Sequence, residues 1–86
     1  MRNVWKLTPR ESACFRLMAL GYSYNEIAQR MDIGADTVRN YGMIAMQKYG
    51  ITRNHVLAMA LHRGIVTTDE AIEHLPDRAK ELCEFL

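Results

Sequence analysis

Residues 23–49 read SYNEIAQRMDIGADTVRNYGMIAMQKY, and this stretch decides the fold. Ser23 and Glu26 have the spacing of a capping box at the start of a short helix, which is followed by apolar residues on one helical face. Residues 32–34 interrupt this pattern and contain a glycine. Apolar residues then recur at helical spacing from residue 35 to residue 49. The stretch therefore predicts a short helix, a tight turn and a longer second helix, which together form a helix-turn-helix.

Further helices are predicted on both sides of this pair. The sequence Thr8-Pro9-Arg10-Glu11 gives a second capping box with a proline in the first turn, and Gly21 supplies a left-handed residue where this helix ends. After Gly50, the six consecutive apolar residues 56–61 indicate a fourth helix that is apolar on every side. No strand-like alternation is present, so the expected fold class is all-α with short connections.

The tail, residues 67–86, predicts more helix and forms a second unit after the helix-turn-helix domain of residues 1–66. Thr68 can cap a short helical turn, Pro76 interrupts it, and Asp77 can cap a last helix. The apolar stripe of that last helix consists of Ala79, Leu82, Cys83 and Leu86. This stripe either packs on the preceding helices or docks on another protein.

Composition narrows the class of protein. The chain has 86 residues and a mass of 9.9 kDa, with 49% hydrophobic and 24% charged residues, which fits one globular domain. It has no apolar run of the length that a membrane span needs, and its start lacks the apolar core of a signal peptide. We therefore expect a cytoplasmic protein with no membrane partner. Cys14 and Cys83 lie in apolar helical patterns and are expected to be buried free thiols.

Charge divides unevenly along the chain. Residues 1–66 hold nine Lys and Arg against four Asp and Glu, whereas residues 67–86 hold two against six. A basic body is compatible with a polyanionic partner such as nucleic acid. One hypothesis is that the acidic tail lies against this basic body and competes with DNA phosphates.

The outward face of the helix over residues 35–49 carries the side chains that suit DNA recognition. Arginine can bind guanine with two hydrogen bonds, asparagine suits adenine, and a threonine or a backbone amide at the helix start can hold a phosphate. With the apolar face turned inward, this outward face presents Asp36, Thr37, Arg39, Asn40, Met43, Ile44 and Gln47. The pattern predicts a helix that fits the DNA major groove.

Six short blocks of the sequence occur in the order that one family of regulators shows. They are Leu7-Thr8-Pro9-Arg10-Glu11, Ala19-Leu20-Gly21-Tyr22-Ser23, Glu26-Ile27-Ala28, Thr37-Val38-Arg39-Asn40, Gln47-Lys48-Tyr49-Gly50-Ile51 and Ala60-Leu61-His62-Arg63-Gly64-Ile65-Val66. Over about residues 7–66 the chain resembles the LuxR/FixJ-type helix-turn-helix DNA-binding domain. The resemblance implies a four-helix domain, here with an extra C-terminal helical tail.

The resemblance also implies roles for individual residues. Arg39, Asn40 and Met43 occupy base-reading positions, Thr37 and Lys48 lie near phosphates, and Arg53 precedes the fourth helix. The expected DNA-binding residues are Ser23, Tyr24, Thr37, Arg39, Asn40, Met43, Ile44, Gln47, Lys48 and Arg53. The fourth helix pairs two copies in the family, so we expect a homodimer formed through Val56, Met59, Ala60 and Arg63.

The leading functional hypothesis is a free-standing transcriptional regulator that binds double-stranded DNA sequence-specifically as a dimer. The alternative is a helix-turn-helix-derived protein-interaction module that antagonises or modulates a LuxR-type regulator. Met43 and Ile44 stand where the family usually has polar or basic residues, so they either contact thymine methyl groups or form an apolar patch for a protein partner. The C-terminal helix is a second candidate for such a partner.

The sequence offers no pattern for an enzyme, a cofactor or a metal. His55, His62 and His74 lack the spacing and the cysteine companions of a zinc site. No serine, histidine and aspartate set and no phosphate-binding glycine loop is present. We therefore expect no enzymatic activity, no cofactor and no metal ligands.

Overall fold

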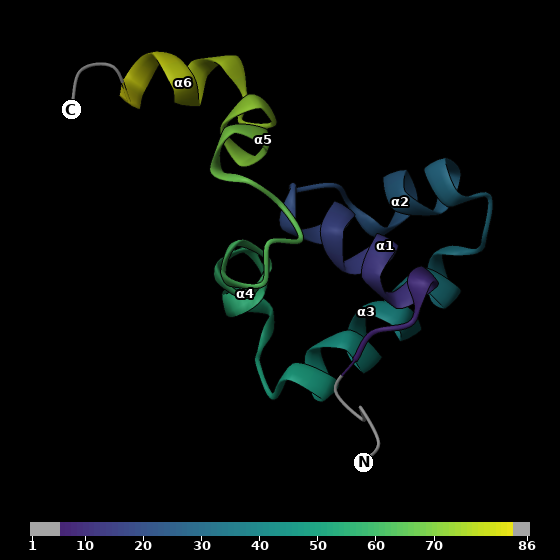
Figure 1. Cartoon of the computed structure of the whole chain (residues 1–86). Helices are drawn as coiled ribbons and strands as arrows, with labels where there is room; N and C mark the ends of the chain where they lie inside the picture. The colour runs from purple at the N-terminus through teal and green to yellow at the C-terminus, as the bar shows by residue number, and fades with distance from the viewer. Residues whose placement is uncertain (1–5, 84–86) are drawn as a thin grey trace.

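The computed structural model describes residues 6–83 of the chain and the side chains of residues 6–81. Within this range the chain is all helical and has no strand, as predicted (Figure 1). The elements are α1 (Pro9–Ala19), α2 (Tyr24–Met31), α3 (Ala35–Tyr49), a single 3₁₀ turn η1 (Arg53–His55), α4 (Val56–His62), α5 (Thr68–Glu73) and α6 (Asp77–Cys83).

The predicted helix-turn-helix is formed by α2 and α3. Its capping box is present, because the Ser23 amide donates to Glu26 Oε1 over 2.8 Å and the Glu26 amide donates to Ser23 Oγ over 3.2 Å. The bond from the Ser23 amide holds the pKa of Glu26 below its ordinary value. The left-handed residue of the turn is Asp32, with φ of 55°, whereas Gly34 is extended and caps α3 without a side-chain hydrogen bond.

The predicted start and end of the first helix are confirmed. The Glu11 amide donates to Thr8 Oγ1 over 3.3 Å, and the Thr8 amide donates to Glu11 Oε1 over 3.0 Å. Gly21 has φ of 98°, a backbone conformation that costs glycine little, and follows the last turn of α1. The signals that set where this helix begins and ends are therefore local in the sequence.

Helix α1 is the centre of the core, because it packs against α2, α3 and α4. Cys14 lies in a cluster with buried residues of α2 and α3, while the next residue, Phe15, lies in a second cluster with residues of α3 and α4. Cys14 is a buried free thiol, as predicted, and burial raises its pKa. The buried apolar residues are Cys14, Phe15, Leu20, Ile27, Ala28, Val38, Ala45, Val56, Ala60 and Val66.

Two polar contacts join the described part of the tail to the body, one from α5 and one from His74, the residue that ends it. Glu70 forms an ion pair with Arg16 of α1, and His74 Nε2 shares a hydrogen bond of 3.1 Å with the Tyr22 hydroxyl. Figure 1 shows α5 and α6 extending from the body on the side away from α3. The described part of the tail therefore does not cover the outward face of α3, which the competition hypothesis would require.

Two details of the predicted tail are wrong. The cap of α5 is Thr67 and not Thr68, because Glu70 stands three residues after Thr67 and completes a capping box with it. Asp77 lies inside the first turn of α6, whose first hydrogen bond runs from the Lys80 amide to the Pro76 carbonyl. The predicted apolar stripe cannot be placed as a whole, since the side chains of Leu82 and Cys83, and all of Leu86, lie outside the described residues.

Gly42 of α3 faces Met18 of α1, and the lack of a side chain at position 42 leaves room for the methionine. A Cβ atom at this position would lie 2.6 Å from Met18 Sδ and 3.2 Å from Met18 Cε. Met18 therefore fills the space that a branched residue at position 42 would otherwise occupy, and the two positions are coupled.

A double-mutant cycle tests this coupling. Gly42→Ala should raise the free energy of unfolding by about 1 kcal/mol more in a Met18→Ala chain than in the wild-type chain, because the helix propensity gain is then no longer offset by a clash. Urea unfolding of the four chains, followed by circular dichroism, measures the difference. Effects that add to within about 0.3 kcal/mol would contradict the close contact.

Candidate nucleic-acid interface

The outward face of α3 is exposed along its whole length. Val38, Gly42 and Ala45 are buried against α1 and α2, which turns the opposite side of the helix to solvent. The exposed residues of that side are Asp36, Thr37, Arg39, Asn40, Met43, Ile44 and Gln47. The exposed fractions of Met43 and Ile44 are 47% and 38%, which is high for apolar residues of this size. The structure thus brings six of the predicted DNA-binding residues onto one surface.

Two arginines converge on the ring of Tyr24 beside this face. The guanidinium carbon of Arg39 lies 5.5 Å from the ring centroid, and that of Arg53 lies 4.9 Å from it. Both are within the range of a cation–π contact. Tyr24 begins α2, Arg39 belongs to α3 and Arg53 begins η1, so this cluster joins three elements that are separate in the sequence. It places two positive charges at one edge of the outward face.

Ser23 lies at the same edge, immediately before Tyr24. Its amide and its hydroxyl are both engaged with Glu26 in the capping box. The predicted contact between Ser23 and DNA would therefore have to share these groups with the cap. Asp36 adds one negative charge to the face, and its carboxylate lies 3.9 Å from Arg39 Nη1 with both side chains mostly exposed. An exposed pair at this distance is weak.

Lys48 lies away from this surface. Its ammonium donates to Glu11 Oε1 over 2.7 Å and to the Lys6 carbonyl over 3.2 Å, so it links the last turn of α3 to the start of α1. Burial alone would raise the pKa of Glu11, but the hydrogen bonds from Lys48 and Thr8 outweigh it and hold this pKa below its ordinary value. The predicted phosphate contact of Lys48 stays a prediction, and the structure gives this residue a second role inside the fold.

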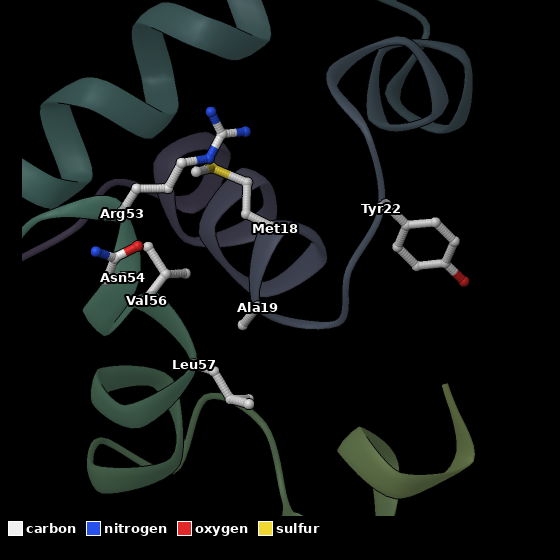
Figure 2. A pocket seen from close by; sticks show the side chains of 7 residues that line it. All are labelled: Met18, Ala19, Tyr22, Arg53, Asn54, Val56 and Leu57. Carbon is white, nitrogen blue, oxygen red and sulfur yellow. The ribbon is translucent and has the colours of Figure 1, made fainter. Parts of the chain in front are cut away.

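Figure 2 shows a pocket behind Arg53, between the end of α1 and the start of α4. Its volume is about 200 Å³, and the side chains of Arg53 and Met18 are both part of its lining. The other lining residues are Ala19, Tyr22, Asn54, Val56 and Leu57. Met18 therefore faces Gly42 of α3 and also lines the pocket that contains Arg53.

The structure divides the predicted dimerisation residues between two environments. Val56 and Ala60 are buried in the chain's own core, and their contact with a second copy stays a prediction. Met59 is partly exposed and Arg63 is exposed. Met59 also lines a shallow apolar hollow with Ile51, His55, Ala58 and His62. Leu57 and Leu61 are exposed on another side of α4. These outer positions offer exposed area for a dimer through α4.

The sequence did not predict a cluster of Arg30, Tyr22 and His74 that links α2 to the tail. The guanidinium of Arg30 lies 4.1 Å from the ring centroid of Tyr22, and the Tyr22 hydroxyl reaches His74 of the tail. Tyr22 and His74 also pack edge to face, with ring centroids 5.5 Å apart. No sequence signal links residues 52 positions apart, so only the fold reveals this contact.

Among the described residues, no three His, Cys, Asp or Glu side chains are placed so that they could hold a metal ion. None of their helices is both long and apolar enough to cross a membrane.

The fold and this surface define a helix-turn-helix protein. Comparison with known families identifies it further, since the family model described as bacterial regulatory proteins, luxR family, matches residues 6–61, and the chain belongs to this family of DNA-binding regulators. The match runs from the residues before α1 to α4 and ends before the tail. Searches of curated proteins and of solved structures found no match. The resemblance seen in the sequence is thereby confirmed, and the family is not one of enzymes.

Proposed function

We propose that this chain is a sequence-specific transcriptional regulator that binds double-stranded DNA by inserting α3 into the major groove. The observation that supports this most is the outward face of α3, which stays uncovered by the described part of the tail and carries Arg39, Asn40 and Gln47. These three side chains offer the donors and acceptors that match guanine and adenine edges. Their exposed helix has the 15 residues, or about 22 Å, that suit a recognition helix.

The edge of this face supplies the phosphate contacts in the proposal. Arg53 and Tyr24 lie together beside α3, and Arg39 is near enough to reach either a base or a phosphate. The first turn of α3 has no side-chain cap, so its backbone amides can also donate to a phosphate at that end. In this arrangement the arginines orient the domain while α3 reads the bases.

A homodimer on a two-fold DNA site is part of the proposal. The support is the outer surface of α4, where the apolar hollow around Met59 and the exposed Leu57 and Leu61 offer area for a second copy.

Selection of bound duplexes from a random pool, followed by titration at several salt concentrations, tests the function. We expect a symmetric preferred sequence and a slope of log affinity against log salt of about −4 to −5. Four to six phosphate contacts give such a slope, because each contact contributes about −0.9 through the release of counterions. The full chain is used, and a scrambled duplex of the same composition serves as the control. Recovery of no preferred sequence would contradict the proposal.

A protein-interaction module is the second candidate, and the exposed Met43 and Ile44, with Asp36 two turns earlier on the same face, favour it. Such a module would bind a LuxR-type regulator and show only weak, sequence-independent DNA binding. The same titration separates the two functions. A flat salt response, together with tight binding to a LuxR-type regulator in solution, would favour the module.

A further inference from the structure

Met43 lies at the middle of the outward face of α3, and Ile44 stands next to it. At 100° per residue, Asp36, Asn40, Met43 and Gln47 share one stripe along the helix. Residues three and four apart are neighbours on a helix surface, so both Met43 and Ile44 adjoin Asn40 on one turn and Gln47 on the next. The two apolar side chains therefore have an amide side chain one turn before them and another one turn after them.

The groups around this apolar pair match a DNA groove better than a protein surface. Asn40 and Gln47 are the side chains that suit adenine, and every adenine pairs with a thymine whose C5-methyl group projects into the same groove. One helical turn advances 5.4 Å, compared with about 3.4 Å for one base pair, so a side chain one turn from Asn40 reaches the neighbouring pairs. Arg39 adds positive charge beside the pair, which suits a polyanion.

We propose that Met43 and Ile44 are specificity-determining residues that contact the C5-methyl groups of thymines next to an adenine bound by Asn40. This inference rests on the proposed function and adds the base composition of its target. The preferred duplex contains adenine and thymine at the pairs that the middle of α3 faces. Thymine differs from uracil only by this methyl group, which an apolar side chain recognises favourably.

Deoxyuridine substitution in the selected duplex tests the inference directly. Replacing single thymines by deoxyuridine removes only the methyl group and keeps base pairing. We expect a loss of about fourfold in affinity at one or two thymines per half-site, because burial of one methyl group corresponds to about that factor. The loss at those thymines should disappear in a Met43→Gln chain or in an Ile44→Gln chain.

Ile72→Gln is the matched control, because Ile72 is 50% exposed but lies on α5 in the tail. This chain should keep the full fourfold dependence on the methyl groups. In a duplex with cytosine at that position, 5-methylcytosine should bind the wild-type chain more tightly than cytosine does, and this gain should be absent in Met43→Gln.

Three results overturn the inference. The first is equal affinity for thymine and deoxyuridine at every position of the selected duplex. If binding to that duplex still depends on Arg39, the proposed function remains intact. The second is a deoxyuridine effect that persists unchanged in both glutamine chains, which would assign the methyl dependence to DNA shape. The third is the absence of any selected sequence, which would remove the proposed function together with the inference.

Discussion

Lys48→Met is expected to lower the free energy of unfolding by about 2 kcal/mol at neutral pH, which for a domain of this size lowers the melting temperature by about 10 °C. The side chain of Lys48 is 24% exposed and that of Glu11 is 8% exposed, so the substitution leaves a carboxylate largely buried without its cationic partner. Thermal and urea unfolding followed by circular dichroism measure the change.

The pH dependence of this effect has a definite sign. Because the folded state holds the pKa of Glu11 below its ordinary value of 4.5, the pair stabilises the fold above that value and the contribution is lost as the pH falls through the lower, folded-state pKa. The difference in stability between the wild-type chain and Lys48→Met should therefore be full at pH 7 and shrink on acidification below 4.5.

Glu11→Gln and the double variant complete a cycle for the same pair. Glu11→Gln should also destabilise the fold, and the double variant should be more stable than the sum of the single effects predicts. Lys80→Met in the tail serves as the matched control, since it removes one lysine charge without touching Glu11. If Lys48→Met leaves stability unchanged and weakens binding to every duplex equally, Lys48 acts on phosphates as the sequence suggested.

The body's helices could be predicted because their signals are local. The capping boxes at Thr8 and Ser23, and the glycine after α1, act within a few residues and therefore appear in the sequence itself. The outward face of α3 followed from its periodicity, which is also local. The cap of α5 was predictable by the same rule, because only Thr67 has a glutamate three residues later.

Contacts between distant residues could not be predicted in this way. The partners Glu11 and Lys48 are 37 positions apart. In the sequence, Glu11 was already explained by helix capping and Lys48 by the phosphate position that the family resemblance implies. The six consecutive apolar residues of α4 have no periodicity, so nothing in the sequence shows that Val56 and Ala60 point inward. The arginines around Tyr24 likewise come together only when three elements pack.

Arg39→Ala is expected to weaken binding to the preferred duplex by about 5- to 150-fold and to relax the choice of base at one position of each half-site. The side chain of Arg39 is 57% exposed, and its guanidinium carbon lies 5.5 Å from the centroid of the Tyr24 ring. A side chain that is held at the edge of the groove-facing surface loses less freedom when it binds guanine. Selection from a random pool with the variant, followed by titration on the wild-type site, measures both effects.

Arg39→Lys separates base reading from charge. Lysine keeps the positive charge but not the planar fork that binds guanine with two hydrogen bonds, so non-specific affinity and the salt slope should remain while the preference at that base pair falls. Arg78→Ala, which removes an exposed arginine from α6, is the matched control and should leave base choice unchanged. If Arg39→Ala and Arg78→Ala reduced affinity equally on all duplexes, Arg39 would contribute only charge, and base recognition by α3 would depend on Asn40 and the residues that follow it.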